Sequence, residues 1–130
     1  MGPSQAGAVL EGDVIEVADG LAAIRTPAGV LHVAGVTGGR VRIRIRAEDV
    51  IVATQEPQGL SALNTLPAVI EAVQAGQGPG VMLRLQAGDG VLLARLTRRS
   101  FDRLGLGVGQ KVWAVLKTSG VARSDVGGGS

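Results

Sequence analysis

The 130-residue chain has no cysteine and no tyrosine, and only one histidine, one tryptophan and one phenylalanine. Without cysteine, disulfide bonds and thiolate metal sites are excluded, and a single histidine excludes the usual zinc ligand sets. These residues also give no convincing combination of nucleophile, base and orienting group, so we do not expect catalysis. The sequence contains no Gly-x-x-x-x-Gly-Lys-Ser/Thr segment, the loop that binds nucleotide phosphates.

Long apolar runs are missing as well, because none approaches the roughly 18 residues that a membrane span needs. The first residues, Met1 to Ser4, lack the charged and apolar regions of a signal peptide. We therefore expect a soluble cytoplasmic chain. An excess of one charge is also lacking, since the formal net charge of +2 is too small to imply strong nucleic-acid binding.

What the chain does contain is 45% apolar residues and 21 glycines. The apolar residues are mainly valine, leucine, alanine and isoleucine, with valine at many positions typical of strands. This apolar content is enough for a folded core, in one ordinary domain or two very small ones. The composition favours short strands joined by tight turns, so we expect an all-β fold.

Alternating apolar residues bounded by turn residues predict most of the elements. We expect strands at 9–17, 21–25, 30–33, 40–46, 50–53, 66–73, 81–85, 91–96 and 109–117. Ala87-Gly88-Asp89-Gly90 is a strong hairpin signal between two of these strands. Thr97 to Gly105 is the one convincing short helix, with Thr97 as a candidate N-cap and Gly105 as a C-terminal stop.

One strand, 40–46, alternates arginine with valine or isoleucine without a break. The alternation places Arg42, Arg44 and Arg46 on one face and the apolar residues on a core. A basic face could bind an acidic partner or a phosphate backbone, so an OB-type nucleic-acid module is one hypothesis. It is the weakest of three. We favour a strand with one solvated face and expect no nucleic-acid partner, because no aromatic residues interleave for base stacking.

The chain is predicted to consist of two related halves. Segment 38–46 aligns with 109–117 in its turn, its core positions and its terminal base, so that Arg46 falls opposite Lys117. The openings of the halves match as well, Val14-Ile15-Glu16 against Val69-Ile70-Glu71.

These halves predict two small OB-like antiparallel barrels, with the short helix in the second. We place the first barrel at 8–56 and the second at 57–122. Residues 1–7 are expected to be a flexible leader, and 123–130 a disordered tail.

Segment 59–67 lies where the first half gives way to the second, and it holds Asn64, the only asparagine. The segment follows a turn and leads into an apolar run, so Ser61 and Asn64 stand where a strand begins. Small hydroxyl and amide groups beside free backbone N–H groups can bind an anion without a carboxylate that would repel it. The same residues can instead form a turn that caps its own backbone.

Ser61-Ala62-Leu63-Asn64-Thr65-Leu66 resembles the Ser-Ala-Arg-Asn-x-Leu signature that opens molybdate-binding Mop domains of the TOBE type, with Leu63 in the arginine position. Further segments occur in the order found in the C-terminal regulatory part of the molybdate importer's ATPase subunit. They are 44–50, 96–100, 103–106 and 115–119. With the spacing between them, the resemblance covers most of residues 7–121. It implies a tandem Mop/TOBE-type fold without the nucleotide-binding ATPase domain, and thus no enzyme.

The resemblance also implies a site for molybdate or tungstate at a homodimer interface, and no cofactor. Such a dianion carries no proton at neutral pH, so its site should be rich in donors and poor in acceptors. Ser61 to Asn64 would face Thr97, Ser100 and Lys117 of the other chain, giving two equivalent sites. The full set implied for oxyanion binding is Ser61, Ala62, Leu63, Asn64, Thr97, Ser100, Lys117 and Thr118.

The start of the helix would add partial positive charge at this site through its free N–H groups. Lys117 would add a full charge. Each residue also has a purely structural explanation, in which Thr97 caps its own helix, Ser100 satisfies the first turn, and Lys117 is a solvated strand end. We expect no site in the first half, because Glu48 and Asp49 follow Arg46 and would repel a dianion.

The partners implied are a second copy of the chain and the nucleotide-binding domain of a parent ABC transporter. The module would then be peripheral to the inner membrane, without inserting into it. The alternative is a ligand-free dimerisation or spacer TOBE domain of an ABC importer ATPase for another solute, which Leu63 favours. We expect His32 to be packed or partly exposed rather than a ligand, and Trp113 to be a core or dimer contact.

Overall fold

This computed structural model describes residues 6–36, 38–59, 64–75, 78, 80–117 and 121–125, the last of these as backbone only. In the first half the elements are β1 (Gly7–Ala18), β2 (Leu21–Thr26), β3 (Gly29–Ala34), β4 (Arg40–Arg46), the 3₁₀ turn η2 (Ala47–Asp49) and β5 (Ile51–Ala53). In the second half they are β6 (Asn64–Ala75), β7 (Gly80–Ala87), β8 (Gly90–Thr97), the helix α1 (Arg98–Leu104), β9 (Lys111–Leu116) and β10 (Val121–Asp125). None of the helices in these ranges is long and apolar enough to cross a membrane.

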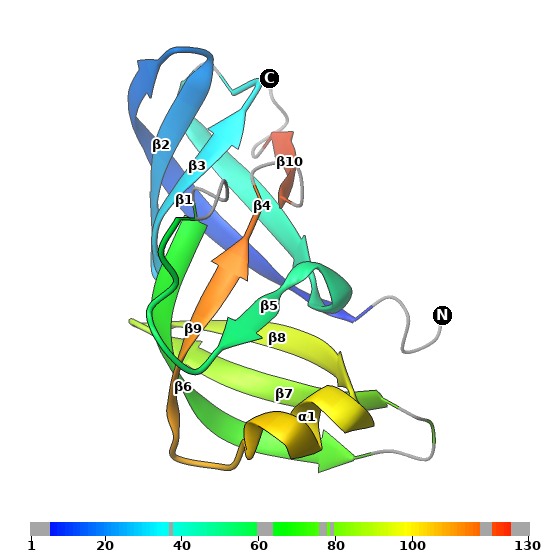
Figure 1. The fold of residues 1–130 in the computed structure, drawn as a ribbon. Helices are drawn as coiled ribbons and strands as arrows, with labels where there is room; N and C mark the ends of the chain where they lie inside the picture. Colours follow the sequence, from blue (N-terminus) through cyan, green and yellow to red (C-terminus); the bar gives the residue numbers. More distant parts are fainter. Residues whose placement is uncertain are drawn as a thin grey trace.

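The strands form two five-stranded antiparallel sheets. The first sheet has the order β10-β4-β1-β2-β3, and the second has the order β5-β9-β6-β7-β8. Both sheets are strongly curled, with the first above the second and α1 against the lower one in Figure 1. The predicted all-β fold of two small OB-like antiparallel units, with one short helix in the second, is confirmed.

Each sheet takes one strand from the other half of the sequence. β5 leaves the first half and pairs with β9, with Val52 opposite Ala114. β10 returns from the second half and pairs with β4, with Arg123 opposite Ile43. Figure 1 shows β10 beside β4 and β5 beside β9. The expected division between residues 56 and 57 therefore does not separate the two sheets.

The pairing of β10 with β4 corrects part of the expectation of a disordered tail at 123–130. Arg123, Ser124 and Asp125 belong to β10, where they pair with β4. The physical reason is that β4 would otherwise be an edge strand with unpaired N–H and C=O groups, which the C-terminal segment pairs. The start of the chain differs by one residue, since Gly7 already pairs with Arg46 in β1 and β4. Residues 1–5 and 126–130 lie outside the described residues.

Alternation of side chains places the core between the sheets. Along β4, Val41, Ile43 and Ile45 are buried while the intervening arginines are exposed. The buried residues of both halves form one continuous cluster, from Leu10 in β1 to Leu116 in β9. The two OB-like units therefore share a core and stabilise each other.

The predicted two-fold repeat is present, with a one-residue shift in one alignment. The backbone N–H of Val14 donates to the Gly39 carbonyl at 2.9 Å, and that of Ile70 donates to the Gln110 carbonyl at 2.9 Å. Register irregularities follow at the same points, between Val14 and Glu16 in β1 and between Ile70 and Ala72 in β6. Val14 thus corresponds to Ile70, whereas the sequence match had set it against Val69. Apolar residues on both sides made the two alignments indistinguishable in the sequence.

The β2–β3 and β7–β8 turns pack against each other where the two halves meet. The Asp89 N–H donates to the Pro27 carbonyl at 2.9 Å. Gly88 has a φ of 55°, and a Cβ there would lie 2.7 Å from the Pro27 oxygen. A Cβ on Gly90 would lie 2.9 Å from the Ala28 nitrogen. Both glycines therefore allow a close backbone approach that other residues would prevent.

The arginines of β4 face solvent among carboxylates of β1. Arg40 donates to Asp13 at 3.0 Å and to Glu11 at 3.4 Å, and Arg42 donates to Glu11 at 3.3 Å. The hydrogen bond with Asp13 raises the pKa of Arg40 above its ordinary value. The arginine stripe is thus largely neutralised within the chain, which favours a solvated strand over a nucleic-acid surface.

Candidate functional site

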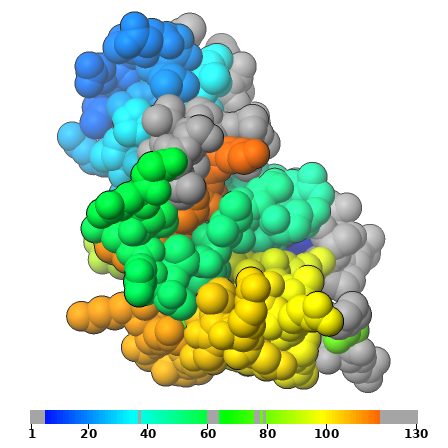
Figure 2. Space-filling model, viewed as in Figure 1, coloured from blue at the N-terminus to red at the C-terminus, as the bar shows by residue number. Residues whose placement is uncertain are grey.

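The first group of predicted site residues lies where β8 passes into α1. Thr97 has an extended backbone, and its Oγ1 accepts a 3.1 Å hydrogen bond from the Ser100 N–H. Gly105 ends the helix in the left-handed conformation, with φ 64°. The predicted N-cap and C-terminal stop are therefore confirmed. Figure 2 shows α1, in yellow, on the molecular surface, which leaves its exposed residues accessible.

Asn64 begins β6 and is 1% exposed. Its Oδ1 accepts from the His32 N–H at 2.7 Å, and its Nδ2 donates to the His32 carbonyl at 3.0 Å. The side chain therefore pairs with the backbone of β3 as a neighbouring strand would. It joins the edge of the first sheet to the second sheet, a role that the sequence did not predict because its partner lies 32 residues earlier.

Lys117 lies beside Asn64 of its own chain. Asn64 pairs with Leu116, the last residue of β9, and Lys117 follows directly with an exposed side chain. This placement differs from the expectation that Lys117 would join Thr97 and Ser100 opposite Asn64. The reason is the antiparallel pairing of β6 with β9, which brings the end of β9 to the start of β6.

The two groups of site residues stand at opposite ends of the second sheet. Asn64 is the first residue of β6, and its last residue, Ala75, pairs with Val81 of β7. Thr97 pairs with Gly80, next to Val81, and so lies near that far end. Figure 1 shows the same separation, with the end of β9 in the middle of the molecule and α1 at its base. One chain therefore does not bring Thr97 and Ser100 to Lys117.

Four residues of the predicted site, Ser61, Ala62, Leu63 and Thr118, lie outside the described residues. The two described neighbours of these residues in sequence, Asn64 and Lys117, lie at one corner of the second sheet. We call this the Asn64–Lys117 corner, defined by Asn64 and Lys117.

The corresponding corner of the first half has a different charge. Arg46 is the last residue of β4, whereas Lys117 follows the last residue of β9, and the Arg46 guanidinium forms an ion pair with Glu48 of η2. The cation is therefore already neutralised within its own chain. The expectation that the first half offers no site to a dianion stays a prediction.

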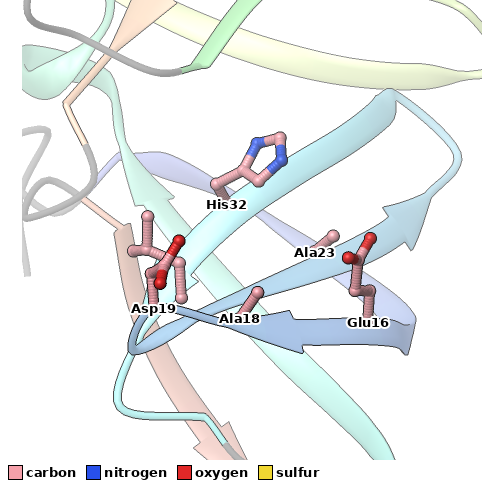
Figure 3. Close-up of a pocket in the computed structure, with 6 residues that line it drawn as sticks. Glu16, Ala18, Asp19, Ala23 and His32 are labelled. Atoms are coloured by element: carbon pink, nitrogen blue, oxygen red, sulfur yellow. The ribbon is translucent and has the colours of Figure 1, made fainter.

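A hollow of about 300 Å³ lies on β1, β2 and β3 next to His32. Figure 3 shows the carboxylates of Glu16 and Asp19 on either side of Ala18 and Ala23, with the His32 ring above them. Within the described ranges, no three His, Asp or Glu side chains are arranged to hold a metal ion. The His32 Nδ1 is buried and has no hydrogen-bond partner among the described residues. This hollow could not be predicted from the sequence, because it depends on the register of three strands.

Trp113 is half-buried on the outer face of the second sheet rather than in its core. Its neighbours in β9, Val112 and Ala114, are both buried, so its side chain points the opposite way. Ala53 and Pro67 flank it on the adjoining strands. The expectation of a core position is wrong, and that of a dimer contact stays a prediction.

The chain is similar in sequence to one protein family and to a set of curated proteins. Residues 60–122 match the family described as "TOBE domain". The chain is 42% identical, over 96% of its length, to the molybdenum import ATP-binding protein ModC of Mesorhizobium japonicum. It is 41% identical, over 88% of its length, to ModC of Rhizobium etli. The chain spans about a third of the length of these relatives, 35% and 34% respectively.

A solved structure has a similar fold along nearly the whole chain. It is that of the cytoplasmic molybdate-binding protein ModG with molybdate bound, and it superimposes with a TM-score of 0.79. The match covers 91% of this chain and 95% of that one at 21% sequence identity. At this identity the similarity shows the fold alone.

Proposed function

Since residues 60–122 belong to the TOBE domain family and the chain is homologous to molybdenum import ATP-binding proteins, we propose that it is a regulatory module that binds molybdate or tungstate. The observation that carries this proposal is the 42% identity to ModC over 96% of the chain. In this proposal the module acts in the cytoplasm, beside the nucleotide-binding domain of an ABC importer at the inner membrane. It does no chemistry of its own.

The Asn64–Lys117 corner supplies one side of the oxyanion site. Lys117 is exposed and contributes a full positive charge to a dianion. Ser61 and Thr118 contribute hydroxyl donors, and the backbone N–H groups of Ala62 and Leu63 complete this side. Asn64 does not contact the oxyanion in this proposal, because its amide is already bonded to His32. It holds the start of β6 in place.

Thr97 and Ser100 of a second copy supply the other side. This division between copies is supported by their place at the far end of the second sheet from Lys117. A homodimer with two-fold symmetry then contains two equivalent sites. The oxyanion stabilises the arrangement of two copies that it bridges, which is how its concentration could bias a transporter.

A second function is favoured by one residue. Leu63 stands where the related signature carries arginine, so a side-chain charge is absent there. The chain would then be a ligand-free dimerisation or spacer TOBE domain of an ABC importer ATPase for another solute.

Titration calorimetry at near-physiological salt separates the two functions. The chain is titrated with molybdate, tungstate, sulfate and phosphate, and the experiment is repeated with Lys117→Ala. Lys111→Ala is the matched control, because Lys111 is also exposed but stands at the opposite end of β9. We expect about one molybdate per chain, and a dissociation constant raised at least about tenfold by Lys117→Ala alone.

Two other results would change the conclusion. Absence of heat for every oxyanion, at concentrations where sedimentation detects a dimer, would favour the spacer function. Equal weakening by Lys117→Ala and Lys111→Ala would indicate a nonspecific electrostatic effect and contradict the site at this corner.

A further inference from the structure

Two carboxylates of the hollow have no cationic partner in the part of the chain that the structure describes. Within the described ranges, Glu11, Asp13, Glu48 and Glu71 all form ion pairs with arginines of their own half. Glu16 and Asp19 form none there, which is also true of Asp49, Glu56, Asp89 and Asp102, but Glu16 and Asp19 are the two that line the hollow beside His32. Two like charges on one hollow repel each other unless a cation lies between them.

Helix α1 presents an excess of the opposite charge, since it contains three arginines and one aspartate. Arg99 and Arg103 are both exposed, are four residues apart on one face, and form no ion pair with any described residue. Like charges at this spacing are unfavourable in a helix. Asp102 follows Arg98 by four residues and Arg99 by three, so this one carboxylate neighbours both and leaves the helix with an excess of positive charge.

The geometry of the helix relates these arginines to Ser100. At 3.6 residues per turn, Arg99 lies about 100° and Arg103 about 60° from Ser100, both on the same side. Arg98 lies about 160° away, on the opposite side of the helix. A surface that meets Ser100 therefore also meets Arg99 and Arg103, and not Arg98.

The hollow adjoins the Asn64–Lys117 corner through paired residues. Glu16 pairs with Ala23, and Ala23 pairs with His32, so these residues form one row across β1, β2 and β3. The His32 backbone is bonded to the Asn64 side chain. With strands about 4.8 Å apart, Glu16 lies about 10 Å along the row from His32. His32 thus lines the hollow and also contacts the corner, so the two features adjoin.

We propose that Arg99 and Arg103 of one copy enter the hollow of the other copy and form ion pairs with its Glu16 and Asp19. The inference rests on the proposed function, in which α1 of one copy meets the Asn64–Lys117 corner of the other. Ala18 and Ala23 leave room for the guanidinium groups, since larger side chains there would fill the hollow. The two equivalent contacts fix the register in which the copies face each other.

Charge reversal on either side tests the proposal in the full chain. The dimer dissociation constant is measured by sedimentation equilibrium with saturating molybdate for Glu16→Lys/Asp19→Lys and for Arg99→Glu/Arg103→Glu. We expect each to raise that constant about tenfold to a hundredfold. The combined four-residue exchange restores opposite charges and should return it to within about threefold of the original.

Controls separate this contact from general electrostatics. Arg98→Glu lies on the opposite face of α1, and Asp89→Lys replaces an exposed turn carboxylate, so neither should change the dissociation constant more than about twofold. Circular dichroism compares the fold of each variant. If a reversed variant fails to fold, the neutral pair Glu16→Gln/Asp19→Asn replaces it, and it should remove most of the salt dependence of dimerisation.

The outcomes distinguish this inference from the proposed function. Molybdate-linked dimers that tolerate both reversals, or a combined exchange without recovery, would overturn the ion pairs and leave the oxyanion site standing. A chain that stays monomeric and binds no molybdate would overturn both.

Discussion

At the scale of single residues, Asn64 is the side chain on which the corner depends. Its amide satisfies both backbone groups of His32 on β3, the edge strand of the first sheet. A buried backbone group that loses its partner costs more than the bond itself contributes, because water does not replace the partner.

We predict that Asn64→Ala destabilises the chain by about 2 kcal/mol, since it leaves the His32 N–H and carbonyl unpaired in a partly buried position. Asn64→Asp keeps an acceptor for the N–H but sets an oxygen against the carbonyl, so it should also be destabilising. Urea unfolding followed by circular dichroism measures both. Thr65→Ala, a change at the half-exposed neighbour, serves as the control. A loss below about 0.5 kcal/mol for Asn64→Ala would contradict this role.

The sequence allowed part of this corner to be predicted. Asn64 stood out as the only asparagine, and its polar side chain suggested an anion donor. The bond to His32 could not be predicted, because it depends on how two sheets pack and not on the residues around Asn64. The same limit applies to the hollow, whose carboxylates and histidine come from three strands.

At the scale of elements, local sequence predicted nearly every strand and the helix. The alternation in β4 and the turn before Gly90 are local signals, and α1 carries its own cap and stop residues. The sequence did not predict that β5 joins the second sheet and β10 the first, because strand partners depend on hydrogen bonds between distant segments. The composition of an apolar strand such as β5 does not indicate which sheet it joins.

The cap of α1 yields a second prediction. We expect Thr97→Ala to cost about 1 kcal/mol, because the Ser100 N–H loses its acceptor. Thr97→Ser keeps a hydroxyl in the same place and should retain most of that stability. Hydrogen exchange of the amides of α1 gives the local readout. Equal protection in Thr97→Ala and the unmodified chain would contradict the contribution of the cap.

At the scale of the whole molecule, the stability of each half depends on the contact between the two halves. The β2–β3 and β7–β8 turns meet at a distance that only glycine allows, and the buried residues of both sheets form one cluster. A change at this contact should therefore affect both sheets together and leave unfolding a single transition.

We predict that Gly90→Ala destabilises the chain by about 1–3 kcal/mol, because the added Cβ would overlap the backbone of Ala28. Gly107→Ala is the matched control, since a Cβ there meets nothing within 4 Å. Thermal unfolding of both variants measures the difference. A second transition in Gly90→Ala would indicate that the sheets unfold independently and would contradict a shared core.

The late arrival of β10 also has a consequence for synthesis on the ribosome. β4 is made before β10, its second neighbour, which begins at Val121. The edge of β4 that β10 covers therefore stays unpaired until β10 has been made. An open edge is where nascent chains associate wrongly with one another. Pairing of β10 with β4 covers that edge and leaves β4 with a neighbour on both sides.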